Sequence, residues 1–204
     1  MPYLSITVTA HNSAGLPDAV AFALERELPF NLNFVREPGV RRVGNLSYSD
    51  DHIVTGLKAA FAVIEAELPR RRLIDGLVDR SAFGALHEHP CGAGRNYMVI
   101  DCRGRVTRCQ MAMDQPVTDV WADDPLQAVR EWHEGFQNIS VDEKVGCRDC
   151  TWRYWCAGGC PLLAYRTTCR SDVPSPYCTV YKALYPDVLL LEGLRLLKWQ
   201  SPPN

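Results

Sequence analysis

The chain has 204 residues, of which 47% are hydrophobic and 23% are charged. This balance is typical of globular proteins, and it excludes fibrous and disordered classes. The 22 basic and 24 acidic residues leave a formal net charge of −2, so we expect no nucleic-acid partner. No apolar stretch is long enough to span a membrane, and the N-terminal residues lack the pattern of an export signal. We therefore expect no membrane association and a cytoplasmic location.

Strands and helices alternate in the first 84 residues. Tyr3–Thr9 and Phe30–Arg36 have the alternating pattern of strands, and Asp18–Leu28 between them has the pattern of a helix. Ser49 supplies a cap signal for a second helix that runs to Leu68. This order predicts parallel strands joined by right-handed crossovers. Because two strands are too few for a buried parallel sheet, we expect residues 1–84 to be the end of a larger α/β domain.

The rest of the chain is rich in loops. A hairpin is expected over Asn96–Cys109, with Arg103 and Gly104 at its turn. Pro125–Phe136 and Asp187–Trp199 have the pattern of helices. The last helix carries an apolar stripe of Leu190, Leu194 and Leu197, which we expect to pack on the core.

All nine cysteines fall between residues 91 and 178. The odd count and the missing export signal disfavour a disulfide framework. A metal site is the better interpretation of such a cluster in a reducing compartment.

The densest part of the cluster reads C-x2-C-x5-C-x3-C and runs from Cys147 to Cys160, with Pro161 directly after it. A C-x2-C turn directs two sulfurs to one metal centre, and glycines beside a cysteine allow backbone N–H groups to approach sulfur. Structural zinc commonly takes two C-x2-C pairs, but only one is present here. Cys91 and Cys109 upstream and Cys178 downstream bring the set to seven. Seven cysteines fit two iron–sulfur clusters better than two closed zinc sites, and zinc remains the alternative.

The complete pattern is C-x12-G-x4-C, then C-x2-C-x5-C-x3-C, then a last cysteine. It resembles the seven-cysteine signature of the SPASM domain. This domain is the C-terminal extension of radical S-adenosylmethionine enzymes that modify peptides and proteins, such as anaerobic sulfatase maturases and peptide maturases.

The resemblance implies an architecture in three parts. Residues 1–84 would be the last βα repeats of a partial (β/α)6 radical S-adenosylmethionine barrel. Residues 85–185 would be a loop-rich α+β SPASM domain with a β-hairpin and two iron–sulfur clusters. Residues 186–204 would be a C-terminal helix and tail.

The resemblance also implies the ligands of two auxiliary [4Fe–4S] clusters. Those of the first would be Cys91, Cys109 and Cys160. Those of the second would be Cys147, Cys150, Cys156 and Cys178. The fourth ligand of the first cluster is open, with Cys102, His87 and His89 as candidates. Cys169 has no place in the pattern and is expected to be a free thiol.

One element of the family is missing from this sequence. The C-x3-C-x2-C motif, which holds the cluster that cleaves S-adenosylmethionine, requires cysteines before Cys91, and there are none. We therefore expect S-adenosylmethionine only in the complete enzyme, and cluster binding as the direct activity of this chain. It is expected to be the C-terminal part of a longer enzyme, with a degenerate or split partner as the alternative.

Two further residues are candidates for binding a cofactor or peptide. Asn12 follows the first predicted strand and Arg36 ends the second, and barrel enzymes gather their chemistry at these strand ends. Turn and capping chemistry is the alternative for Asn12, and a surface ion pair is the alternative for Arg36.

The sequence therefore predicts part of a peptide- or protein-modifying enzyme. Its expected partners are a peptide or protein substrate and an electron donor or acceptor. A stand-alone electron-transfer or scaffold partner of a separate chain is the second hypothesis, and a zinc-ribbon interaction module is the third.

Overall fold

The computed structural model describes residues 2–9, 11–36 and 49–199. Strands β1 (Leu4–Val8) and β2 (Phe30–Phe34) pair in parallel and are joined by α1 (Leu16–Glu25). The predicted strand–helix–strand order and parallel pairing are confirmed. Leu4 lies opposite Phe30 and Val8 lies opposite Phe34, so the two strands are in full register.

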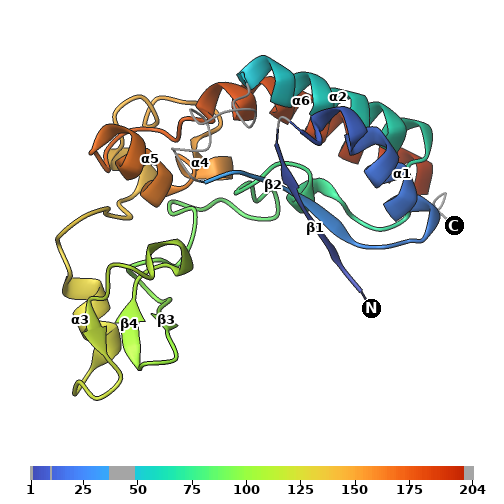
Figure 1. Cartoon of the computed structure of the whole chain (residues 1–204). Helices are drawn as coiled ribbons and strands as arrows, with labels where there is room; N and C mark the ends of the chain where they lie inside the picture. The colour runs from blue at the N-terminus through green and yellow to red at the C-terminus, as the bar shows by residue number, and fades with distance from the viewer. Residues whose placement is uncertain (1, 10, 37–48, 200–204) are drawn as a thin grey trace, which may run out of the picture.

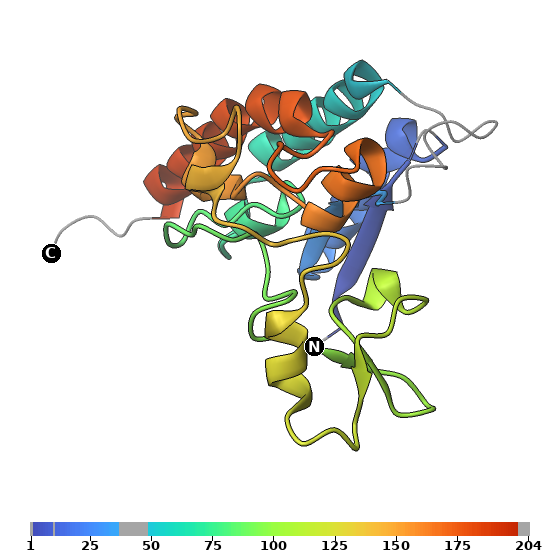
Figure 2. The ribbon, with the colours of Figure 1, turned by 90° about the vertical axis from the view of Figure 1, so that its left-hand side faces the viewer.

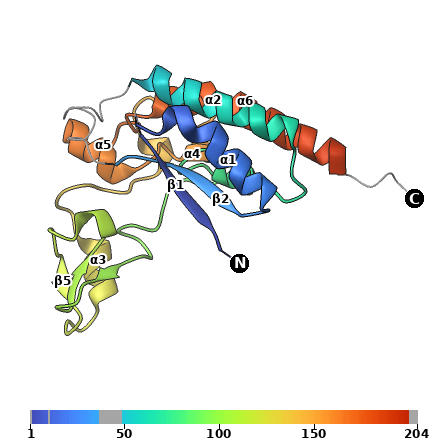
Figure 3. The ribbon, with the colours of Figure 1, turned by 45° about the vertical axis from the view of Figure 1, so that its right-hand side comes forward.

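Helices cover one face of this sheet. α2 (Asp50–Ala66) packs against α1 and against α6 (Cys178–Trp199), and the three lie together on the same side of the strands (Figure 1; Figure 3). Alternate residues of β2 are buried toward the helices, whereas Asn31 and Asn33 between them are half-buried on the other face. The sheet therefore has one apolar, covered face and one polar face.

The larger of two hydrophobic clusters joins the N-terminal part to the cysteine-rich part. It contains Val8 and Leu57 from the first 84 residues, and Cys160, Leu162 and Tyr185 from the remainder. The predicted division at residue 84 is therefore not a break in the core.

The last helix is longer than expected. α6 begins at Cys178 rather than at Asp187, because Pro186 lies inside the helix and does not start it. The predicted boundary between residues 185 and 186 thus falls within one continuous helix.

The predicted packing stripe on this helix is wrong. Leu190 is 56% exposed and Leu197 is 75% exposed, while Leu194 is half-buried. The buried face is instead set by residues from the earlier turns of the helix. These buried residues are Val180, Tyr181, Leu184, Tyr185, Val188 and Leu191.

A second sheet, antiparallel and built of three short strands, forms a separate part of the molecule (Figure 2). Its strands are β3 (Val99–Ile100), β4 (Arg105–Thr107) and β5 (Thr118–Asp119), and α3 (Pro125–Glu131) lies beside them. The predicted hairpin is confirmed, with Gly104 at its turn at φ +75°. α3 ends at Glu131, five residues before the predicted end.

Short helical segments complete the chain. Along the loops they are η1 (Ser13–Gly15), η3 (Ile74–Gly76), η4 (Gln110–Ala112), η5 (Val141–Glu143), α4 (Arg153–Cys156) and α5 (Pro161–Thr168). Within the described ranges, no helix combines the length and apolarity needed to cross a bilayer.

The contact between α2 and α6 gives a test of the shared core. Leu57 of α2 is fully buried, so we expect Leu57→Ala to lower the free energy of unfolding by about 2–5 kcal/mol, through lost burial and the cavity left behind. Leu197→Ala removes the same group from an exposed position, and it should change stability by less than about 0.5 kcal/mol. Urea unfolding of the two variants measures the difference, and equal effects would contradict the assigned core.

Candidate functional site

Four of the cysteines line one cavity. Cys147 and Cys150 lie in the turn after η5, where the Cys150 amide donates to the Cys147 carbonyl at 2.8 Å. Cys156 is the last residue of α4 and Cys178 is the first of α6. All four line the same pocket together with Tyr181 and Tyr185 of α6 and other residues. The start of α6 at Cys178 is thus what brings the last cysteine of the chain back to the C-x2-C turn.

Three other cysteines line a second cavity of about 520 Å³. Cys91 comes from the loop before β3, Cys109 follows β4, and Cys160 is the N-cap residue of α5. The amide of Met111 donates to Cys109 Sγ at 3.5 Å, and Asn138 Nδ2 lies 4.0 Å from Cys91 Sγ. N–H groups directed at sulfur are the contacts that tune metal–thiolate centres.

A tight turn connects the two cavities. Cys156 lines the first and Cys160 lines the second, and Ala157, Gly158 and Gly159 between them all have left-handed backbones, with φ of +46°, +75° and +70°. Left-handed residues of this kind are rare outside glycine. The turn reverses the chain in three residues and directs consecutive cysteines of the motif to different sites.

A buried lysine lies against this turn. Lys144 is 1% exposed, and its Nζ donates to the Ala157 carbonyl at 3.0 Å. A Cβ on Gly158 would lie 2.7 Å from Lys144 Cδ, so the lysine fills the space that the glycine leaves. Burial lowers the pKa of Lys144, and negative charge on Cys147, Cys156, Cys91 and Cys160 acts in the opposite direction.

Four of these thiols, Cys147, Cys156, Cys160 and Cys178, are not activated as nucleophiles. Burial raises the pKa of Cys147 to about 11, with Lys144 opposing the shift. Burial also raises the pKa values of Cys156, Cys160 and Cys178. Reactive cysteines need a lowered pKa, so these four have the character of ligands or structural thiols.

The two cavities differ in size. The four-cysteine cavity has room for at most one water molecule, about 10 Å³, against about 520 Å³ for the other. Across the described part of the chain, no three histidine, cysteine or carboxylate side chains are arranged so that they could hold a metal ion. The cysteines of each group therefore share a cavity, but their side chains are not arranged around a common metal position.

The remaining cysteines and the two histidines lie elsewhere. Cys102 and Cys169 are exposed, and neither lines either cysteine cavity. His89 pairs with Arg95, and His87 lines a third cavity on the polar face of the β1–β2 sheet. None of the proposed fourth ligands borders the three-cysteine cavity as described.

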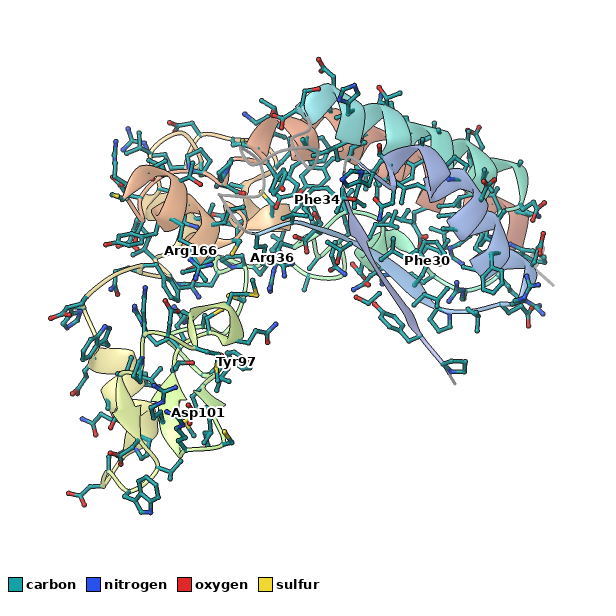
Figure 4. The ribbon with its side chains drawn as sticks, in the orientation of Figure 1. Phe30, Phe34, Arg36, Tyr97, Asp101 and Arg166 are labelled. Atoms are coloured by element: carbon teal, nitrogen blue, oxygen red, sulfur yellow. The ribbon has the colours of Figure 1, made fainter. Side chains whose placement is uncertain are left out.

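Arg36 lies between two cavities. It lines the three-cysteine cavity and also the third cavity, whose walls include Asn31 and Asn33 from the polar face of the sheet. Figure 4 shows Arg36 at the end of β2, on the side where Arg166 of α5 and Tyr97 lie. Its guanidinium forms an ion pair with Asp79, which is 5% exposed at the side chain. The surface ion pair considered from the sequence is thus a largely buried one.

Asp79 and Arg80 were not found from the sequence. Burial raises the pKa of Asp79, and the charges of Arg36 and Arg80 oppose this shift. Arg80 has a left-handed backbone at φ +58° and borders the same two cavities as Arg36. The Nε atoms of both arginines are buried without a hydrogen-bond partner among the described residues. No motif marks Asp79-Arg80, so only the fold could reveal the pair.

Asn12 is used by its own turn. Its Oδ1 accepts from the Thr9 amide at 2.7 Å, and its Nδ2 donates to the Thr7 carbonyl at 2.8 Å. The side chain is exposed. These contacts are the turn chemistry considered for Asn12, and its role toward a cofactor stays a prediction.

Comparison with known proteins gives one distant relative. No family model and no solved structure matches the chain. An uncharacterized protein from Archaeoglobus fulgidus is 26% identical over 192 residues, covering 88% of this chain. The match spans 46% of that relative, so the chain corresponds to about half of its length.

The Arg36–Asp79 pair gives a test of whether Arg36 stabilises the fold. Arg36→Leu leaves the Asp79 carboxylate buried without its partner, so we expect a loss of about 3–5 kcal/mol in the free energy of unfolding. Arg26→Leu breaks an exposed pair with Glu25 and should cost less than about 1 kcal/mol. The double variant Arg36→Leu/Asp79→Leu should recover much of the loss. An Arg36→Leu effect as small as that of Arg26→Leu would show that the pair does not stabilise the chain.

Proposed function

We propose that this chain binds two [4Fe–4S] clusters, as the C-terminal part of a radical S-adenosylmethionine/SPASM enzyme that modifies a peptide or protein. One observation carries the cluster-binding part of the proposal. The seven cysteines of the sequence pattern separate into a group of four and a group of three, each lining its own cavity. Cys102 and Cys169, which lie outside the pattern, line neither cavity.

The chemistry of the donor sets fits these groups. Cys147, Cys150, Cys156 and Cys178 provide the four thiolates that a closed cluster needs. Cys91, Cys109 and Cys160 provide three, which leaves one position for a ligand other than cysteine. The four-cysteine cavity is narrow, so binding there requires its loops to move apart. Bound clusters would supply one-electron chemistry.

The enzymatic part of the proposal rests on the resemblance of the cysteine pattern. Its expected partners are a peptide or protein substrate and an electron donor or acceptor, and S-adenosylmethionine would belong to the complete enzyme. All nine cysteines are free thiols, which fits the cytoplasmic location that we propose. The alternatives are an electron-transfer or scaffold partner of a separate chain and, less favoured, a zinc-ribbon module.

Metal and sulfide analysis of variants tests cluster binding. After anaerobic purification we expect about eight irons and eight sulfides per wild-type chain, because two clusters of four are proposed. Cys150→Ala removes a ligand of one site and Cys109→Ala removes a ligand of the other. Each should lower the iron content by about four per chain, and the double variant should lose nearly all iron.

Cys102→Ser and Cys169→Ser are the matched controls, since each removes a cysteine that borders neither cavity. Both should keep the full iron content. A wild-type chain that holds zinc without sulfide would exclude the cluster proposal and favour the zinc-ribbon module. Loss of iron in the two control variants would contradict the assignment of ligands.

A further inference from the structure

We propose that Lys144 is a fixed positive charge shared by the two cysteine sites, where it favours the reduced state of both clusters. This inference rests on the proposed function and assigns a role to a residue outside the cysteine pattern. In this role Lys144 does not bind iron, and its charge tunes the reduction potentials of the clusters. The argument starts from what surrounds this side chain.

Among the residues that the structure describes, Lys144 has no carboxylate partner. The residue is 1% exposed, and its Nζ donates to the Ala157 carbonyl at 3.0 Å. No ion pair of Lys144 occurs among the described residues. A lysine is rarely buried without a counter-charge, because removing an ammonium from water costs several kcal/mol. An anion next to this position would offset that cost.

Lys144 contacts backbone segments that lead to both sites. Its carbonyl accepts from the Cys147 amide at 3.1 Å, which ties its backbone to the four-cysteine site. Its ammonium contacts the Ala157–Gly159 turn, which leads directly to Cys160 of the three-cysteine site. Gly158 also lines the four-cysteine cavity. Lys144 therefore lies at the connection between the two cavities.

A fixed cation at this connection has a defined electrostatic effect. Thiolate-ligated clusters carry negative charge, and net charge and hydrogen bonding to sulfur set their reduction potentials. Reduction adds one more negative charge, which a nearby ammonium stabilises. The interaction is strong because the interior screens charge less than water does. Removing the charge should therefore lower both potentials.

Lys182 provides a matched comparison. It is a lysine of α6 that borders the four-cysteine cavity, but it is exposed. It does not line the three-cysteine cavity. Water and salt screen an exposed charge, so Lys182→Met should have a small effect confined to one site.

The experiment is a redox titration of the full chain, purified anaerobically, with the two clusters followed by electron paramagnetic resonance. Lys144→Gln keeps a hydrogen-bond donor and removes the charge, whereas Lys144→Met removes both. We expect both variants to keep about eight irons and to show an at least tenfold less favourable reduction of each cluster. For a one-electron couple this corresponds to about 59 mV.

The outcomes separate this inference from the proposed function. A wild-type chain without iron and sulfide would overturn both. Unchanged potentials in iron-replete Lys144→Gln and Lys144→Met, or a shift in Lys144→Met alone, would overturn only the role of the charge. If both variants lose iron, urea unfolding of the metal-free chains decides. Stability equal to that of the metal-free wild type supports the charge role, and lower stability indicates a packing role and overturns it.

Discussion

The left-handed turn Ala157–Gly159 is the constraint on which the arrangement of the cysteines depends. Three successive residues with positive φ allow Cys156 and Cys160 to reach different cavities although only three residues separate them. Both glycines are also needed for space. A Cβ on Gly158 would meet Lys144, and one on Gly159 would lie 2.5 Å from the Ser175 Cβ. A regular helix would instead place residues four apart on one face, and both cysteines would then point to a single site.

The N-terminal sheet and the cysteine-rich region are joined by shared cavity walls and by the contacts of Tyr177. Arg36, Arg80 and Gln110 line both the three-cysteine cavity and the cavity on the polar face of the sheet. Tyr177, just before α6, donates from its hydroxyl to the Val35 carbonyl at 2.7 Å, and its ring packs on Phe34. A polar surface of the α/β part therefore lies beside the three-cysteine site.

Elements with a strong sequence signal were predicted correctly, and those without one were not. The strands, α1, α2 and the β3–β4 hairpin follow from periodicity and turn residues, and the structure has them. The start of α6 was missed because Pro186 breaks helices in most contexts. Here the rings of Tyr181 and Tyr185 pack on Phe34, Phe83 and Trp152 and hold the preceding turns. The division of the cysteines into two groups was predicted from the resemblance to the SPASM pattern, and each group lines its own cavity. Lys144 carries no such signal, since a lysine in a polar stretch is ordinarily exposed.

The charges buried in the cysteine-rich region lead to the same conclusion as the cysteine pattern. Arg108 is 5% exposed and donates to the carbonyls of Phe136 and Glu134, and Lys144 donates to that of Ala157. Neither forms an ion pair with a carboxylate within residues 49–199. Carbonyl dipoles stabilise a buried cation only in part, so each position favours an anion nearby. Thiols that are ionised when they bind metal are such anions, and Cys109 beside Arg108 and Cys147 beside Lys144 are the nearest in sequence. The buried cations therefore support the proposal that these thiols bind metal.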